Sequence, residues 1–169
     1  MRVGFQQINF AIPAQTAVGT AKVTITGTPS GTLNGAMTIV SVAPGLFSVS
    51  GGWAAALYSR YTTDLAPIET NKPIFDPNTA KGVPIPRNPG EQLYLILYGT
   101  GIRGHSVAGV TATVGGVSVP VLGAVPTSQF VGEDQINIGP VPASLPSGTQ
   151  AIVLTVDGKK TNGPGVVLQ

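Results

Sequence analysis

The sequence predicts an all-β fold, and three observations support this prediction. Short runs rich in Val, Ile and Thr either alternate apolar and polar residues or are apolar throughout, as strands do. The 23 Gly and 15 Pro are spread along the chain without a period of three, which is typical of tight turns and not of collagen. No ten-residue stretch keeps the apolar spacing of an amphipathic helix, so we expect little helix.

The composition is that of a folded chain with a core. The chain has 169 residues, enough for one ordinary domain or two small ones, and 42% of them are hydrophobic against 9% charged. The net charge is +2 and the basic residues are dispersed, so we expect no nucleic-acid-binding face. The absence of cysteine excludes disulfides and thiolate metal sites. No apolar run is long enough to predict a membrane span, and no signal peptide is recognisable.

Six segments carry the strand pattern, and each is bounded by Gly, Pro or Asn. Two of them, 110–114 and 117–122, flank Gly115-Gly116, whose conformational freedom suits a two-residue hairpin turn. The predicted strands are 20–26, 36–42, 92–98, 150–156, 110–114 and 117–122.

The stretch 51–90 lacks a sustained strand pattern because six prolines interrupt it. A structureless loop of this length is improbable in a compact domain. We therefore expect an ordered excursion with one or two short edge strands, or a helical turn near Ala54 to Tyr58 inside GWAAALYSRY, the best helical candidate.

Two glycine-containing motifs resemble catalytic or nucleotide-binding signatures but lack their context. GTGIRG at 99–104 follows a strand, yet the residues after it are β-branched and Gly-broken where a dinucleotide fold needs a helix. GHSVAG at 104–109 places Ser106 as in a nucleophile elbow. The chain has one histidine, His105, next to that serine, so a Ser-His-acid triad cannot be assembled.

The acidic residues show no metal-ligand spacing, and Glu133-Asp134 is the one adjacent acidic pair. We predict no metal, no cofactor and no catalytic residue, while a calcium site assembled from loops stays an open alternative. If the chain were an enzyme, its best residues would be Asp64, Glu69 and Asp76 in the excursion.

Three aromatic residues, Trp53, Tyr58 and Tyr61, cluster in the excursion and are the candidate ligand-binding residues. Loop aromatics can stack on sugar rings, which would make the chain a carbohydrate-binding module. A single Trp in a small β domain is more often part of the core, so packing is the alternative interpretation.

One sequence pattern occurs twice in the chain. QINIGPVPASLPSGTQAIVLTVDG at 135–158 repeats features of QINFAIPAQTAVGTAKVTITG at 7–27. Its Asn, Pro and Gly-Thr steps are typical of strand ends and turns. We interpret the repeat as one structural ending used in two consecutive units, and it predicts equivalent local structure at Gln7-Ile8-Asn9 and Gln135-Ile136-Asn137.

These segments, in order, also resemble a known family. VGFQQINFAIPAQTAVGTAKVTITG, VAPGLFSVSGG at 42–52, LYLILYGTGI at 93–102, VTATVGGVSVPVLGAVP at 110–126 and GEDQINIGPVPASLPSGTQAIVLTVDGKKTN at 132–162 resemble the uncharacterised C-terminal domain family of Solibacter-type acidobacterial secreted proteins. That family is similar to immunoglobulin-like, IPT/TIG-related β-sandwiches. The chain departs from its pattern at Glu133-Asp134, where an apolar and aromatic pair usually stands.

The resemblance implies two units: residues 1–43 as the C-terminal part of a first immunoglobulin-like unit, and 44–169 as a complete second one. The implied function is a non-enzymatic module for adhesion, spacing or assembly, extracellular or at the cell surface, within a longer exported protein. A carbohydrate-binding module appended to a secreted polysaccharide-active enzyme is the alternative. The implied partners are other protein domains of the same or a neighbouring chain, reached by β-strand addition, and a polysaccharide under the alternative.

Overall fold

The chain consists of two compact units. The boundary between them along the sequence lies between Ser41 and Val42, close to the predicted boundary at residues 43 and 44. The structure is a computed structural model and describes residue 8, residues 10–28 and residues 31–169. Gln7 and Asn9 lie outside the described residues, so the predicted equivalence of the two Gln-Ile-Asn segments stays a prediction.

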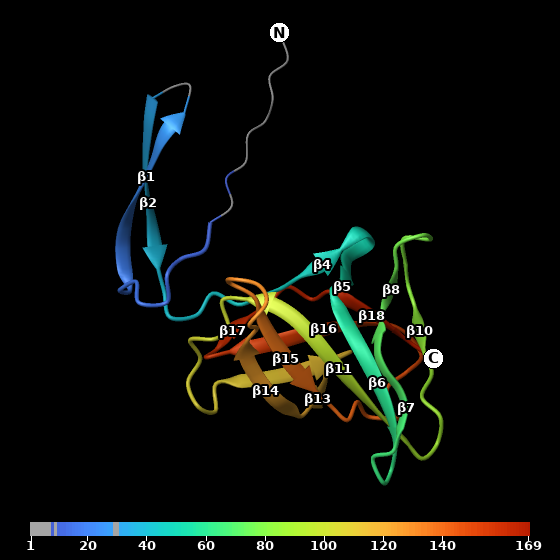
Figure 1. The fold of residues 1–169 in the computed structure, drawn as a ribbon. Helices are drawn as coiled ribbons and strands as arrows, with labels where there is room; N and C mark the ends of the chain where they lie inside the picture. The colour runs from blue at the N-terminus through green and yellow to red at the C-terminus, as the bar shows by residue number, and fades with distance from the viewer. Residues whose placement is uncertain (1–7, 9, 29–30) are drawn as a thin grey trace. The chain divides into compact units, whose positions relative to one another are not determined.

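The first unit contains one antiparallel hairpin of β1 (Gly19–Thr28) and β2 (Gly31–Ile39) (Figure 1). The predicted strand 20–26 lies within β1, whereas the predicted strand 36–42 is correct only at its start, since β2 ends at Ile39. In register, Ala21 faces Met37 and Ile25 faces Leu33, so one face of the hairpin is apolar.

The second unit contains two larger sheets. The six-stranded sheet has the order β14-β15-β11-β6-β7, with β3 paired to the end of β11. Its strands are β3 (Gly45–Leu46), β6 (Ala56–Thr62), β7 (Pro67–Pro73), β11 (Glu91–Thr100), β14 (Val121–Pro126) and β15 (Asp134–Ile138).

The eight-stranded sheet has the order β13-β12-β16-β18-β5-β4, with β10 paired to β18 and β17 to β16. Its strands are β4 (Ser48–Val49), β5 (Trp53–Ala54), β10 (Pro84–Ile85), β12 (Val110–Val114), β13 (Val117–Val119), β16 (Gly148–Val156), β17 (Lys159–Lys160) and β18 (Gly165–Leu168). A separate pair joins β8 (Phe75–Asp76) to β9 (Lys81–Gly82).

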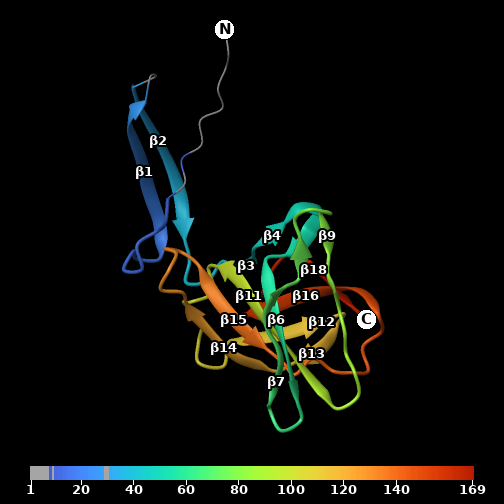
Figure 2. The ribbon, with the colours of Figure 1, turned by 45° about the vertical axis from the view of Figure 1, so that its right-hand side comes forward.

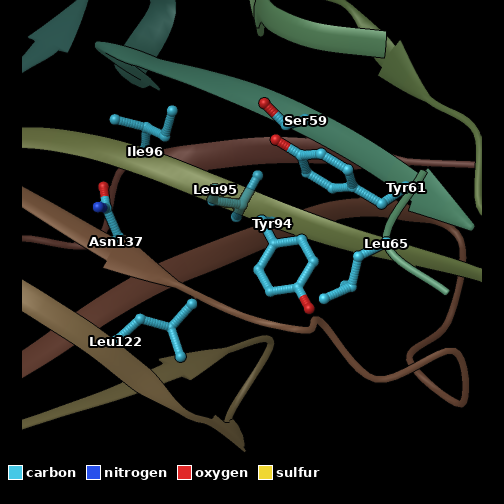
Figure 3. A pocket seen from close by; sticks show the side chains of 8 residues that line it. All are labelled: Ser59, Tyr61, Leu65, Tyr94, Leu95, Ile96, Leu122 and Asn137. Carbon is cyan, nitrogen blue, oxygen red and sulfur yellow. The ribbon is translucent and has the colours of Figure 1, made fainter. Parts of the chain in front are cut away.

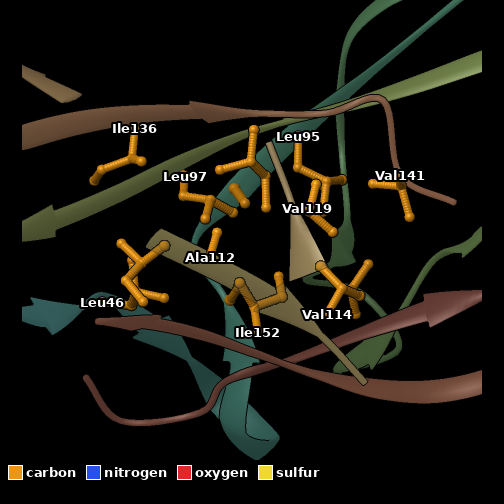
Figure 4. Close-up of a cluster of buried hydrophobic side chains, with 14 of the residues drawn as sticks. Leu46, Leu95, Leu97, Ala112, Val114, Val119, Ile136, Val141 and Ile152 are labelled. Atoms are coloured by element: carbon orange, nitrogen blue, oxygen red, sulfur yellow. The ribbon is translucent and has the colours of Figure 1, made fainter. Parts of the chain in front are cut away.

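The two larger sheets share one hydrophobic core, an arrangement consistent with a β-sandwich. In Figure 4 the side chains of Leu95, Leu97 and Ile136 from the six-stranded sheet lie opposite Ala112 and Ile152 from the eight-stranded sheet. Both ribbon views show β16 crossing β6 and β11 in a second layer (Figure 2). The all-β prediction is therefore confirmed.

Helical structure in the described ranges is limited to one short 3-10 turn, η1 (Ser50–Gly52). No helix in the described part of the chain is long and apolar enough to cross a membrane.

The prediction for residues 51–90 is wrong in two respects. The best helical candidate contains β6, an interior strand that pairs with β11 on one side and β7 on the other. The prolines do not prevent a seven-residue strand, because Pro67 and Pro73 stand at the two ends of β7, the last strand of its sheet. Interior pairing of β6 overrides the local helix preference of Ala56 and Leu57.

The turn prediction at Gly115-Gly116 is confirmed. Both glycines have positive φ, 56° and 80°, and Val114 pairs with Val117 across the turn. The single strand predicted over 117–122 is two strands, because Pro120, which lacks a backbone donor, separates β13 in one sheet from β14 in the other. In this way one short segment passes between the two layers of the core.

The two halves of the sequence repeat share a feature at the start of a strand. Gly19 begins β1 with φ of 126°, and Gly148 begins β16 with φ of 107°. Because both values lie where side chains are strained, glycine is required at each strand start rather than chosen for a ligand. The repeated Gly-Thr step is therefore structural.

Candidate functional site

The outer face of the six-stranded sheet carries the candidate site. Along β11, Leu93, Leu95 and Leu97 point into the core, and the residues between them, Tyr94 and Ile96, are half-buried on the opposite face. That face of the sheet is therefore lined by aromatic and aliphatic side chains that the core does not use.

A pocket of about 360 Å³ lies on this outer face, across strands β6, β11, β15 and β14 (Figure 3). Figure 3 shows Tyr61 and Tyr94 side by side near its centre, with Leu65 and Leu122 at its edges. No charged side chain is among the described residues that line it. These residues are Ser59, Tyr61, Leu65, Tyr94, Leu95, Ile96, Leu122 and Asn137.

The two tyrosines of the pocket form an aromatic pair. The rings of Tyr61 and Tyr94 lie edge to face, with centroids 5.7 Å apart and an interplanar angle of 77°. The Tyr94 hydroxyl donates a hydrogen bond to Oε1 of Gln92, on the same strand and face. Because its ring and its hydroxyl are both engaged, Tyr94 is held in a fixed orientation.

Two polar side chains complete the pocket. Nε2 of Gln135 donates to Oδ1 of Asn137 at 3.0 Å, which leaves the amide N–H groups of Asn137, a lining residue, available as donors. The buried hydroxyl of Ser59 accepts from the backbone N–H of Asn71 at 3.0 Å, which leaves its own hydrogen for donation. The pocket thus combines an apolar, aromatic surface with neutral hydrogen-bond donors.

The structure does not bring the three predicted ligand-binding aromatics together. Tyr61 lines the pocket, but Trp53 lies on β5 in the other sheet and Tyr58 is buried in the core. The ring of Trp53 packs so closely on two glycines that a Cβ at Gly82 would lie 2.9 Å from it, and a Cβ at Gly165 3.2 Å from it. Trp53 therefore serves packing.

Tyr58 belongs to a polar cluster at the β6–β7 pair. Its hydroxyl donates to Oε2 of Glu69, and Nε of Arg60 lies 3.2 Å from the same oxygen. Arg60 also approaches Glu91, with Nη1 3.5 Å from Oε2. Burial, followed by the nearby charge of Glu69, raises the pKa of Tyr58 above its ordinary value. Glu69, one of the acids considered for catalysis, is thus neutralised by an arginine.

The other two acids considered for catalysis stabilise turns. The Thr62 hydroxyl donates to Asp64 and lowers the pKa of that carboxyl. The backbone N–H of Asn78 and then the Thr79 hydroxyl donate to Asp76 and lower its pKa likewise. Each carboxylate is engaged within its own turn, and they do not form a converging catalytic set.

Asp134, the second residue of the adjacent acidic pair, is fully buried. Its carboxylate accepts from Nε of Arg103 at 2.7 Å and from the backbone N–H groups of Ile102 and Arg103 at 2.8 and 3.2 Å. A buried carboxylate needs such partners. Its role is to hold the turn of GTGIRG, which joins two strands as predicted.

His105 cannot act as the base for Ser106. Its Nδ1 and Nε2 face the backbone carbonyl oxygens of Ser106 and Ala124. The Ser106 hydroxyl donates to Asp157, whose pKa is lowered chiefly by that hydrogen bond and by the one from the Ser106 backbone N–H. The contact ties the 101–109 loop to the turn after β16.

Residues from two distant segments contact residues 42–46. Asn162 accepts from the backbone N–H of Leu46 at 2.8 Å and donates to its carbonyl oxygen at 2.9 Å, as a paired strand would. Nζ of Lys159 donates to the carbonyl oxygen of Val42 at 2.8 Å. A Cβ at Gly101, where φ is 72°, would overlap the carbonyl oxygen of Ala43. Asn162, Lys159 and Gly101 therefore hold the start of the second unit in place.

Most of the pocket residues are not predicted by the sequence, although one pattern points to two of them. QLYLILY is a predicted strand, and its alternation of Leu with Tyr or Ile assigns Tyr94 and Ile96 to the face opposite the leucines. Ser59, Asn137 and Leu122 gave no comparable signal. Strand pairing alone places Ser59 and Asn137 beside β11 and Leu122 one strand further, on β14.

The described residues contain no group of three or more His, Cys, Asp or Glu side chains placed to hold a metal ion. The loop acids discussed above bind hydroxyls, backbone N–H groups or arginines of the chain itself. No protein-family model, curated protein or solved structure matches this chain.

Proposed function

We propose that the chain is a non-enzymatic, immunoglobulin-like β-sandwich module that acts by adhesion, spacing or assembly. The observation that carries the proposal is that the residues of the repeated and glycine-containing motifs make contacts within the fold. Lys159, Asn162 and Gly101 fasten the chain segment at residues 42–46, and Asp134 holds the neighbouring turn. Side chains that are occupied by such internal contacts stabilise the fold and are not free to take part in a reaction.

A turnover screen tests this proposal. The full chain is incubated with ester, amide, glycoside and phosphoester substrates, and product release is measured against buffer. We expect no release above background. Turnover that is lost on substitution of Asp64, Glu69 or Asp76 would contradict the proposal and indicate that the chain is an enzyme.

We propose an extracellular or cell-surface location as part of a longer exported protein. The low charged content of 9%, together with the resemblance to secreted acidobacterial proteins, supports it. Proteolysis of intact source cells, followed by immunoblotting of this chain, tests the location. Protection from an external protease until the cells are lysed would argue against it.

Assembly by strand addition is one mode of action that the first unit favours. β1 and β2 pair with each other and with no other strand in the described part of the chain. The outer backbone edge of β1 can therefore receive a strand from a neighbouring copy of this chain. Sedimentation equilibrium at increasing concentration tests this mode, and a strictly monomeric chain would rule it out.

A carbohydrate-binding module is the second candidate function, and the placement of Tyr61 favours it. Tyr61 lines a neutral pocket together with a second tyrosine, Tyr94. Trp53 and Tyr58, which packing accounts for, give it no support.

A further inference from the structure

We propose that the pocket on the outer face of the six-stranded sheet binds a neutral saccharide, with one sugar ring lying against Tyr61 and Tyr94. The inference rests on the second candidate function, that of a carbohydrate-binding module. It names a site that extends from Tyr61, through Tyr94 and Asn137, to the edges formed by Leu65 and Leu122.

The chemistry of the lining selects a neutral ligand with both apolar and polar surfaces. The described residues that line the pocket include no charged side chain, so a charged ligand would lose its hydration without a counter-ion. A purely apolar ligand would instead leave the donor hydrogens of the Asn137 amide and the Ser59 hydroxyl without acceptors. A sugar ring satisfies both conditions, because its C–H face is apolar and its rim carries hydroxyl groups.

The pocket is large enough for such a ligand. Its volume of about 360 Å³ falls at the lower end of the range of small-molecule sites. The pocket is open to solvent, so a longer saccharide can extend beyond the ring that Tyr61 and Tyr94 contact.

Two leucines reach the pocket only because the backbone departs from regular geometry. Leu65 is 60% exposed and has φ of 65°, a left-handed conformation that is strained for a branched side chain. Leu122 is also 60% exposed and lies at a register shift between Val121 and Gly123 in β14. A bulge of this kind re-aims a side chain. Both irregularities place an apolar side chain at an edge of the same pocket.

Leu65 lies in the tight turn that follows β6. The turn is held by hydrogen bonds from Leu65 N–H to the Thr62 carbonyl oxygen and from Ala66 N–H to the Thr62 hydroxyl, both at 3.0 Å. Glycine would adopt this conformation without strain. The left-handed backbone at Leu65 therefore places an exposed leucine side chain at the edge of the pocket.

Titration of the full chain with saccharides tests the inference. The probes are the neutral hexasaccharides of glucose, xylose, mannose and N-acetylglucosamine, with oligogalacturonate and a fatty acid as charged and apolar comparisons. Binding is measured by calorimetry and by NMR of the backbone amides. We expect at least one neutral saccharide to bind and to shift the amide signals of β6, β11 and β15.

Substitution of Tyr94 locates the binding. We expect Tyr94→Ala to weaken affinity about tenfold and Tyr94→Phe to retain most of it, since the aromatic face makes the contact. The matched control is Tyr98→Ala, which removes the same residue type from the same face of β11 outside the pocket, and its affinity should stay within about twofold. Circular dichroism confirms that each variant is folded.

Leu65→Gly separates binding from stability. We expect it to raise Tm by about 3 °C while weakening saccharide affinity several-fold. Ala80→Gly, at an exposed turn residue with φ of 53° away from the pocket, should raise Tm similarly and leave affinity unchanged.

Three results would overturn the inference: no binding of any of the four neutral saccharides, preferential binding of oligogalacturonate or the fatty acid, or equal losses from Tyr94→Ala and Tyr98→Ala. Each would leave the non-enzymatic proposal standing. Release of shorter sugars from the probes would instead contradict the non-enzymatic proposal and leave the saccharide site in place.

Discussion

At the scale of single residues, Asp134 shows how a buried carboxylate can serve the structure. Its side chain is fully buried, and the fold supplies it with three donors. Because Arg103 also donates through Nη2 to the carbonyl oxygen of Glu133, the arginine spans both residues of the acidic pair.

We predict that Asp134→Ala lowers the free energy of unfolding by about 3 kcal/mol, since it leaves a buried N–H and a guanidinium without their acceptor. Urea denaturation followed by circular dichroism measures the change. Glu133→Ala is the matched control, and it should change stability by less than about 0.5 kcal/mol. Similar effects of the two substitutions would contradict the assigned role of Asp134.

The hydrogen bonds of Asp157 predict a pH-dependent contribution to stability. Its pKa in the folded chain lies below the ordinary value of 3.8, chiefly through the Ser106 hydroxyl and backbone N–H. The unfolded chain therefore takes up the proton more readily. The contribution is present in full above the ordinary pKa and is lost as the pH falls through the folded pKa.

We predict that Ser106→Ala destabilises the chain at pH 6 and that this difference from wild type shrinks below about pH 4. Urea denaturation at pH values from 6 down to 2 measures it. Ser118→Ala, at an exposed serine of β13, should show no such dependence. A difference that stays constant with pH would rule out the Asp157 contact as its cause.

At the scale of elements, Trp53 packs β5 against the ends of two other strands. A Cβ at Gly82 of β9 or at Gly165 of β18 would lie within 3.2 Å of the Trp53 ring. Glycine at both positions permits this close approach. The ring therefore joins short strands that pair over few residues.

We predict that Trp53→Ala lowers the free energy of unfolding by about 3 kcal/mol and leaves saccharide affinity unchanged. Circular dichroism monitors unfolding, since the variant lacks tryptophan fluorescence, and calorimetry measures affinity. Trp53→Phe should be milder because it keeps an aromatic ring against the glycines. Loss of saccharide binding in a folded Trp53→Ala chain would return this residue to the binding site.

The elements also show which predictions local sequence can carry. β11, β12 and β16 were predicted because their side chains alternate or are apolar throughout, and Gly115-Gly116 because its turn requires positive φ. β6 was not predicted, since its alanine and leucine favour a helix when considered alone. Pairing with β11 and β7 decides its conformation.

At the scale of the whole molecule, the two units differ in how their apolar residues are used. All members of the hydrophobic core cluster lie between Val42 and Leu168, in the second unit. The first unit holds a two-stranded hairpin, a structure that is marginally stable by itself in water.

We predict that residues 42–169 fold cooperatively as a separate chain, whereas residues 1–41 as a peptide show little strand signal. Circular dichroism and thermal unfolding measure both. A chain that begins at Phe47 is the control, because it lacks the Val42 and Leu46 groups bound by Lys159 and Asn162 and should be less stable. Failure of the 42–169 chain to fold would contradict a self-sufficient core in the second unit.

The sequence by itself determined the fold class, the low helix content and the hairpin turn. These properties depend on side-chain periodicity and backbone freedom within a few residues. It also indicated that His105 and Ser106 form no triad, since that follows from residue counts.

Only the tertiary structure decided the site. Tyr61, Tyr94, Asn137 and Leu122 come from four strands, and strand order in the six-stranded sheet brings them to one face. The fold also places Trp53 against two glycines and Tyr58 in the hydrophobic core, so neither lies in the site. Which exposed side chains share a face depends on strand pairing between distant segments, and local periodicity does not encode that pairing.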